Sequence, residues 1–327
     1  MIKYIFKRIL LMIPVILGVV TLIFLINSFA PGDPATQILG TSATEEQKNQ
    51  LREDLGLNEP GVVQYFNYLK NIVTKGDLGI SYSSKQSVSG EIASKFPTTL
   101  KLAGFCTIWS VLVGVPMGIA SAVKRYSWVD NLAMTFALVA VSIPTFWLGI
   151  MMIIVFSVKL HWLPSFGIDK AAGWILPTIA LSVMSIAQIA RTTRSSMLEY
   201  LNSDFVRTAR AKGQKESVVI FKHMFKNALI PIITVAGGTF GALLGGAVMM
   251  EQVFAIPGLG KYMVDAIKAN NYPAVRGGVL YLAVVQSIVN LLIDLIYAFI
   301  DPRIKASFKG GSGKKRIKQK AVKQEGV

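Results

Sequence analysis

The chain has 327 residues, of which 52% are hydrophobic, with a mean hydropathy of +0.51 and a formal net charge of +16. Few soluble domains of this length are so apolar, so the composition indicates an integral membrane protein. The single cysteine excludes a disulfide framework within the chain, and with only two histidines no Cys/His metal site is expected.

Six stretches are long and apolar enough to cross a bilayer, because a core about 30 Å thick needs roughly 20 helical residues. The first has a positive head, but its apolar run exceeds that of a signal peptide and no small-residue cleavage site follows, so we expect a retained span. Pro116 and Pro144 lie in the interior of their stretches, which membrane helices tolerate better than soluble ones. The expected spans of this all-α fold cover about 9–29, 100–122, 131–158, 174–197, 228–250 and 277–300.

Lysine and arginine gather on one face if the N-terminus is cytoplasmic and the chain crosses six times. The cytoplasmic pieces then carry the whole net charge of +16, and the outer pieces are close to balance. We therefore expect both termini inside. Topology and anionic membrane lipid explain the basic charge, and no nucleic-acid-binding motif accompanies it, so no nucleic-acid partner is expected.

The only long outer segment follows the first span and is expected to be helical. Thr44 and Gln47 form a capping box for a helix over 45–55. A second helix is expected from Pro60 to a stop at Gly76, and "SVSGEIASKF" predicts a short interfacial helix before the second span. This insert is either a packing lid or a docking surface for an external partner, and the two are compatible.

The fifth span carries glycines at every fourth position, Gly237, Gly241 and Gly245. On a helix they form one face without side chains, which allows another helix to approach closely. That face is either packed within the subunit or forms an interface with a partner subunit.

The sixth span carries a polar stripe of Gln286, Asn290 and Asp294, which share one helix face. Ionisable groups inside a bilayer usually face a cavity or a partner. Asp294 therefore either pairs with a nearby Arg or Lys, or belongs with the other two to a candidate translocation path.

Motifs for bound ATP or for catalysis are missing from the sequence. No phosphate-binding loop of the form G-x-x-x-x-G-K-[ST] occurs, and neither does H-E-x-x-H or G-x-S-x-G. We expect no catalytic residues and no cofactor bound by this chain. Two alternatives belong to other classes of protein. An intramembrane enzyme would need paired catalytic groups, which the sequence lacks. A stand-alone channel would leave the basic segment at about 203–231 without a role.

The segment between the fourth and fifth spans, about 203–231, is strongly basic and has Gly213 at its middle. "SDFVRTARAK" can form a helix capped by Ser203 or Asp204, and glycine lets the backbone turn. "KESVVIFKHMFKN" can form a second helix. This elbow can fit a groove on another protein, or it is an interfacial amphipathic pair without a partner. Its expected apolar face comprises Val218, Val219, Phe221, Phe225 and Leu229.

The elbow resembles the coupling loop, or EAA loop, of binding-protein-dependent ABC importers, E-A-A-x-x-x-G-x9-I-x-L-P. Gly213 takes the glycine and Arg207, Thr208 and Ala209 take the triplet, so only Ala209 and Gly213 match the general form. "DFVRTARAKG…HMFKNALIP" is nevertheless very similar to the variant of the peptide/nickel permease branch. Stretches similar to this branch follow in order over residues 1 to about 304, among them "FAPGDP", "GDLGISY", "SIPTFWLGI", "VFAIPGLGKYMVDAI" and "DPRI".

The resemblance implies a type I ABC importer permease of the bacterial or archaeal cytoplasmic membrane, similar to the first permease subunit of a dipeptide or oligopeptide importer. Import of nickel or a metal chelate is the alternative. The implied partners are a second, homologous permease subunit, two cytoplasmic ATPase subunits that bind ATP and Mg²⁺, an extracytoplasmic solute-binding protein, and lipid. The implied divisions are the first span with its outer insert (1–94), the five-helix core with the coupling loop (95–301), and a basic tail expected to be disordered (302–327).

Two sets of residues take roles from the resemblance. The first set is expected to couple the permease to the ATPases, and the second to form an outer gating loop that dips toward the path. They are Asp204, Arg207, Thr208, Ala209, Lys212, Gly213, Lys215, Glu216 and Ser217 for coupling, and Ile256, Pro257, Gly258, Leu259 and Gly260 for the gate.

Overall fold

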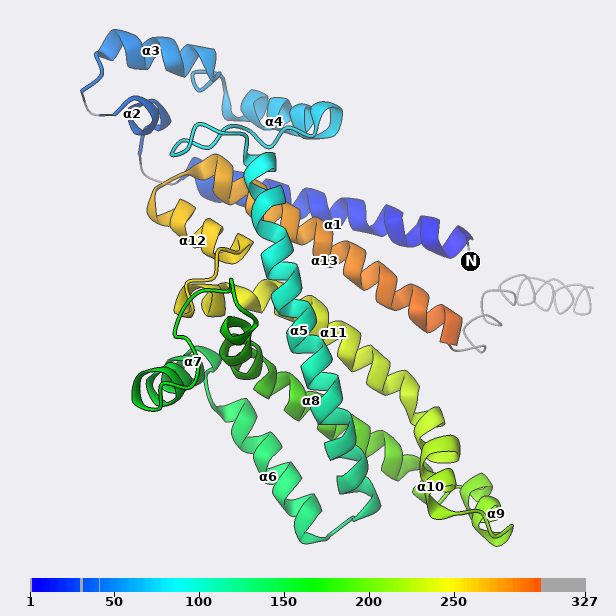
Figure 1. The fold of residues 1–327 in the computed structure, drawn as a ribbon. Helices are drawn as coiled ribbons and strands as arrows, with labels where there is room; N and C mark the ends of the chain where they lie inside the picture. Colours follow the sequence, from blue (N-terminus) through cyan, green and yellow to red (C-terminus); the bar gives the residue numbers. More distant parts are fainter. Residues whose placement is uncertain (1, 30–31, 41, 301–327) are drawn as a thin grey trace, which may run out of the picture.

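The computed structural model describes residues 2–29, 32–40 and 42–300 (Figure 1). Among these residues the chain is helical, and the one β-type pairing is an isolated bridge between Ile80 and Ser87. The expected all-α fold is confirmed, while the basic tail lies outside the described residues. The helices are α1 (Ile2–Ser28), α2 (Pro34–Leu39), α3 (Glu45–Asp54), α4 (Gly61–Lys75), α5 (Val88–Val123), α6 (Trp128–Ser142), α7 (Thr145–Met152), α8 (Ile175–Leu201), α9 (Asp204–Ala211), α10 (Glu216–Val218), α11 (Lys226–Val253), α12 (Leu259–Lys268) and α13 (Tyr272–Ile300), with a π-helix η1 (Ile153–Lys159), a 3₁₀ turn η2 (Ala171–Trp174) and a second π-helix η3 (Val219–Phe225).

Five helical segments of the described chain are each long and apolar enough to cross a membrane, and a sixth, bent pair of helices passes the same test only when its two arms are taken together. The prediction of one continuous third span over 131–158 is wrong, because α6 and α7 with η1 meet at an angle of 100°. Pro144 disfavours helical backbone at the residue before it, and Ile143 is extended with φ −92° and ψ 125°. The expected third span is therefore two helical arms that meet at a sharp bend beside Pro144.

Helix α5 differs from the prediction in the opposite way. The expected short interfacial helix at residues 87–96 is not separate, because α5 begins at Val88 and continues through Pro97 into the second span. Proline removes one backbone hydrogen bond, but its fixed φ is compatible with a helix. The Ser87 hydroxyl caps the new start by accepting from the amide of Gly90 at 3.1 Å. The division at residue 94 stays a prediction, although it falls inside this helix.

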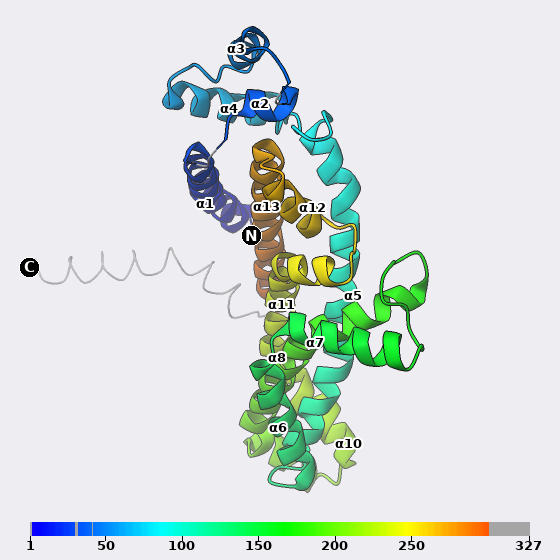
Figure 2. The same cartoon turned by 90° about the vertical axis from the view of Figure 1, so that its left-hand side faces the viewer.

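The core is built by α5, α8 and α11, which supply most of its buried apolar residues. Gly114 and Gly118 let α5 approach α8 closely, since a Cβ at either position would meet the backbone or the side chains of Ile189 or Thr193. Close approach through small residues suits a membrane protein, where lipid provides no hydrophobic drive for helix association. Helix α13 packs on this core, and α1 lies side by side with α13 on its outer side (Figures 1 and 2).

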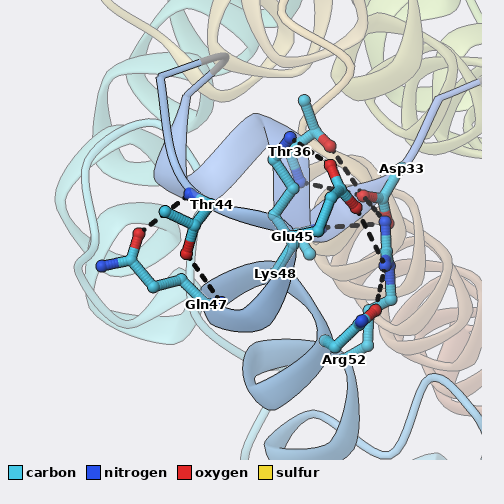
Figure 3. A network of polar contacts seen from close by, with 9 residues as sticks. Asp33, Thr36, Thr44, Glu45, Gln47, Lys48 and Arg52 are labelled. Atoms are coloured by element: carbon cyan, nitrogen blue, oxygen red, sulfur yellow. Dashed lines mark hydrogen bonds and ion pairs between the residues drawn. The ribbon is translucent and has the colours of Figure 1, made fainter.

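The insert after α1 consists of α2, α3 and α4 and lies at the opposite end of the molecule from α9 and α10 (Figures 1 and 2). The predicted capping box is confirmed, because Thr44 and Gln47 exchange hydrogen bonds at the start of α3 (Figure 3). Helix α4 begins one residue after the expected Pro60, and Gly76 ends it with φ 62°. The insert is therefore a structured helical unit.

An ion pair joins the start of α2 to α3 in this insert (Figure 3). The Asp33 carboxylate accepts from the amides of Ala35 and Thr36 and from Arg52 Nε and Nη2 at 3.2 and 2.8 Å. The Arg52 guanidinium and these further donors hold the pKa of Asp33 well below its usual range.

Candidate functional site

The elbow predicted from the sequence is present at one end of the molecule, where α9 and α10 follow α8 (Figure 1). Ser203 occupies the N-cap position of α9, but its hydroxyl donates to the carbonyl of Tyr200 rather than capping the helix. Gly213 has φ +70°, in the left-handed region that glycine adopts at low cost. The predicted helix–glycine–helix turn is therefore confirmed.

One face of the elbow is anchored in the protein. Val206 and Ala209 of α9 are buried with Val219 and Met224 of η3, in a cluster that includes residues of α5 and α8. Ala209 is 4% exposed, so this position of the triplet holds α9 on the permease instead of reaching outward. The elbow is thus mounted on the ends of the core helices.

The apolar face expected for the second helix is wrong in part, because Phe221 is 58% exposed and Met224 is buried. Residues 219–225 form a π-helix, which has more residues per turn than an α-helix and so shifts the phase of the pattern. Val219 remains on the buried face, whereas Val218 is 37% exposed.

The outward face of the elbow is polar and exposed. Ala209 apart, each residue predicted to couple to an ATPase is exposed, and none of the remaining side chains joins the apolar anchor. A Cβ at Gly213 would meet no atom within 4 Å, so the turn itself faces open space. The exposed set is Asp204, Arg207, Thr208, Lys212, Gly213, Lys215, Glu216 and Ser217.

Two side-chain contacts that the sequence did not reveal lie within the elbow, one across Gly213 and one after it. Arg210 Nη2 and Nε donate to the Glu216 carboxylate at 2.6 and 3.2 Å. His223 Nε2 and Gln214 Oε1 lie 2.7 Å apart. The Arg210–Glu216 contact links α9 to α10, and the His223–Gln214 contact links the π-helix to the turn.

A buried ion pair fixes the core behind the elbow. Arg194 of α8 donates to Asp130 of α6 through Nε at 2.6 Å and Nη2 at 2.8 Å. The Ser121 hydroxyl and the Tyr126 amide also donate to this carboxylate, so each oxygen has two donors. Breaking such a pair leaves an uncompensated buried charge and is strongly destabilising. It joins α5, α6 and α8 into one unit.

The expected outer gating loop runs from Ile256 to Gly260; it follows α11, and its last two residues form the start of α12. Ile256 and Leu259 are fully buried and Pro257 is exposed. The described conformation therefore seats most of the loop against the protein, and its gating role stays a prediction.

Glu251, which the sequence analysis did not single out, holds this loop. Its carboxylate is fully buried and accepts from the Thr99 hydroxyl of α5 and from the amide of Lys261 at 2.9 Å. A Cβ at Gly258 would overlap the Glu251 carboxylate, and one at Gly260 would overlap Val248 beside it. An acid at the end of an apolar run, shortly before closely spaced glycines, was the available signal.

The polar stripe of α13 faces two neighbours. Asp294 forms an ion pair with Arg8 of α1 at 2.9 Å. Of the two alternatives expected for Asp294, the structure therefore shows the one in which it pairs with a nearby basic residue. Gln286 donates to Asn290 at 3.2 Å, and Gln286 also fills the space opposite Gly241 of α11. A role of these three residues in a translocation path stays a prediction.

The glycine stripe of α11 divides between an inner and an outer face. A Cβ at Gly237 would meet Ile293 of α13, and one at Gly241 would meet Gln286, so these two serve packing within the subunit. Gly245 is exposed and a Cβ there would meet no atom within 4 Å. The part of the stripe available to a partner subunit is therefore the face with Gly245.

This arrangement defines a class of protein: a helical protein with several membrane-spanning segments and a polar elbow at one end. Two family models match the chain: "Binding-protein-dependent transport system inner membrane component" over residues 114–306, and the N-terminal model of the corresponding membrane component over residues 1–103. The chain belongs to this family of ABC transporter membrane components.

Named relatives are similar over nearly their whole length. A dipeptide transport system permease protein (DppB) of Alkalihalophilus pseudofirmus is 43% identical over 93% of this chain and 100% of the relative. A glutathione transport system permease protein (GsiC) of Salmonella typhimurium is 43% identical over 93% of this chain and 99% of the relative. These relatives place the chain in the peptide/nickel branch of the ABC importers.

Solved structures share the fold. An inward-facing structure of the MetNI methionine ABC transporter has a TM-score of 0.54 and 21% identity, covering 64% of this chain and 96% of that one. A second crystal form has a TM-score of 0.52. The expected type I importer permease fold is confirmed, and the chain is a component of an ABC transporter.

Proposed function

We propose that the chain is a transmembrane permease subunit that translocates di- or oligopeptides across the cytoplasmic membrane by alternating access, driven by ATP hydrolysis in separate subunits. The relatives named for dipeptide and glutathione transport support a short peptide as substrate. Members of this family are transport components, and the chain carries no phosphate-binding loop. Both observations support ATP hydrolysis by separate ATPase subunits.

The observation that carries the proposal is the elbow, whose anchored apolar face and exposed polar face suit docking to a cytoplasmic ATPase subunit. Two such subunits, with bound ATP and Mg²⁺, would act on this permease and on a second, homologous permease. The concentration of positive charge on the elbow side supports a cytoplasmic position for this end and for both termini.

The insert then lies outside the cytoplasmic membrane, on the side of a solute-binding protein. Gating by the loop from Ile256 to Gly260 belongs to this proposal and requires a second position of the loop, because the described conformation seats it against the protein. The exposed face with Gly245 is where we place the second permease.

Uptake by a strain that lacks this gene, with and without the gene restored, tests the proposal. Labelled dipeptide, glutathione and chelated nickel are offered at equal concentrations, and unlabelled forms of each compete. We expect restoration of uptake of at least one peptide and no competition from chelated nickel. Uptake of chelated nickel alone would contradict the peptide assignment and favour the metal-chelate alternative.

A further inference from the structure

A cavity of about 520 Å³ lies where the end of α1, the insert and the start of α13 meet. Asn27 and Phe24 of α1, Asp33 and Arg52 of the insert, and Arg276 of α13 are among its lining residues. The proposed transport cycle assigns no role to this space.

The charges in the cavity leave one arginine uncompensated. The bidentate contact with Arg52 at 3.2 and 2.8 Å neutralises Asp33. Among the described residues, Arg276 has no carboxylate partner and instead lies over aromatic rings, with its Cζ 4.8 Å from the centroid of Tyr68 and 5.9 Å from that of Phe24. The rings hold the guanidinium in place without accepting its N–H donors.

Buried donors around this arginine also have no acceptor. Arg276 Nε and Asn27 Nδ2 are each buried with no hydrogen-bond partner among the described residues, and the Tyr68 hydroxyl beside them is likewise unpartnered. A buried donor without an acceptor is costly and uncommon in native proteins. The chemistry that satisfies these groups is an anion with several oxygens, and the planar guanidinium suits a phosphate.

The position of the cavity favours a phosphate on a lipid. Helix α4 packs beside the membrane-spanning α1, with Tyr65 Oη 2.7 Å from Thr21 Oγ1. Thr21 lies seven residues before the end of α1 at Ser28, so α4 reaches about 10 Å below the end of the span. The cavity beside Asn27 is therefore at the level of lipid headgroups.

Apolar side chains are exposed on both α4 and α1. Val62, Phe66 and Val73 occupy one face of α4 and are 67%, 62% and 82% exposed. Leu22 and Leu25 on α1 are 60% and 51% exposed. An amphipathic helix with such a face beside a membrane span is typical of the bilayer interface, where acyl chains cover the apolar side chains.

We propose that this cavity binds the phosphate headgroup of an anionic outer-leaflet phospholipid, whose acyl chains cover the exposed faces of α1 and α4. The outer position rests on the orientation given under the proposed function. Arg276 and Asn27 donate to the phosphate oxygens. The bound lipid joins the insert to α1 and α13.

The test uses the full-length chain, purified in detergent with the subunits that co-purify with it. Phosphatidylglycerol is titrated in mixed micelles with phosphatidylcholine, and thermal unfolding and retained lipid (by mass spectrometry) are measured. We expect phosphatidylglycerol to raise the unfolding temperature, and Arg276→Gln to weaken its apparent binding by about tenfold. Arg125→Gln is the matched control, because Arg125 stacks on the Tyr126 ring at 4.4 Å and is exposed away from the cavity.

Several results would overturn the proposal. One is Arg276→Gln binding phosphatidylglycerol like the wild type, or Arg125→Gln losing it equally. Another is inorganic phosphate producing the same stabilisation at equal concentration, which would make this a site for a free anion. A third is a variant that retains the lipid but no longer binds the solute-binding protein, which would assign the surface to that partner.

Two further variants keep the test valid if Arg276→Gln fails to fold. Arg276→Lys retains the charge but loses the planar fork, and Asn27→Ala removes only one donor; both are expected to weaken binding by a smaller factor than Arg276→Gln. Wild-type binding by both variants would contradict the proposal. Lipid binding is measured without substrate, so failure of peptide uptake would reject the proposed function and leave this result standing.

Discussion

Replacing Glu251 by Gln tests whether one buried carboxylate holds the loop from Ile256 to Gly260. The two carboxylate oxygens of Glu251 accept from the Thr99 hydroxyl and the Lys261 amide, and Thr99 in turn accepts from the amide of Leu259 at 2.8 Å. The amide nitrogen of Gln would face either the Lys261 amide, which is another donor, or the Thr99 hydroxyl, whose own proton would then have no acceptor. One hydrogen bond is lost and a buried donor is left unpaired, which costs about 2–3 kcal/mol.

We expect this loss of stability to appear as more frequent local opening of the loop, because the contacts of the Glu251 carboxylate join the loop to α5 and α11. A cost of about 2–3 kcal/mol raises the open population by about 30- to 150-fold. Leu259→Cys gives the readout, since position 259 is fully buried and the one native cysteine, Cys106, is also buried. The rate of modification by a water-soluble maleimide is measured with and without Glu251→Gln.

The control for this experiment is Glu46→Gln, which makes the same chemical change at an exposed acid of α3. It is expected to leave the labelling rate at position 259 unchanged. An unchanged rate in Glu251→Gln would refute the reasoning, since the loop would then be held without the carboxylate.

Three further predictions concern helix contacts and the insert. Asp294→Asn is expected to weaken the contact of α1 with α13, and exchange of the two charges between Arg8 and Asp294 to restore part of it, measured by the unfolding temperature; no restoration would mean that the pair is incidental. Gly237→Ala is expected to cost about 1–3 kcal/mol by overlap with the branched side chain of Ile293, whereas Gly245→Ala leaves the isolated subunit unchanged and reduces binding of the second permease; equal unfolding temperatures for both would contradict the packing. The pKa of Asp33 is lowered in the folded protein, so ionised Asp33 stabilises the insert above its ordinary pKa of about 4, and this stabilisation is lost as pH falls toward the folded value. Proteolysis of the insert should therefore accelerate below about pH 4. The acceleration should be absent in Asp33→Asn.

Features that depend on neighbouring residues could be predicted from the sequence. The capping box of Thr44 and Gln47 and the left-handed turns at Gly76 and Gly213 each need only a few adjacent residues, and the structure contains all three. The elbow could be located for the same reason.

Features that depend on tertiary contacts could not. Pro97 lies within a continuous helix while Pro144 follows a break, although both are flanked by apolar or small residues. The difference comes from packing, because the start of α5 is buried against α12 and α13, whereas Ile143 takes the extended backbone that precedes a proline. The Glu251 clamp was missed since Thr99, one of its partners, is 152 residues away.

The central claim is that the elbow is the docking site of a cytoplasmic ATPase subunit. Binding of the purified ATPase subunits to the detergent-solubilised permease tests it, with Gly213→Val and Gly213→Asn compared. A side chain at this position meets no atom of the permease, but φ +70° is strained for Val and tolerated by Asn. Strain of about 1–2 kcal/mol predicts binding about 5- to 30-fold weaker for Gly213→Val and closer to wild type for Gly213→Asn. Wild-type binding and wild-type transport-linked ATP hydrolysis by Gly213→Val would contradict the account.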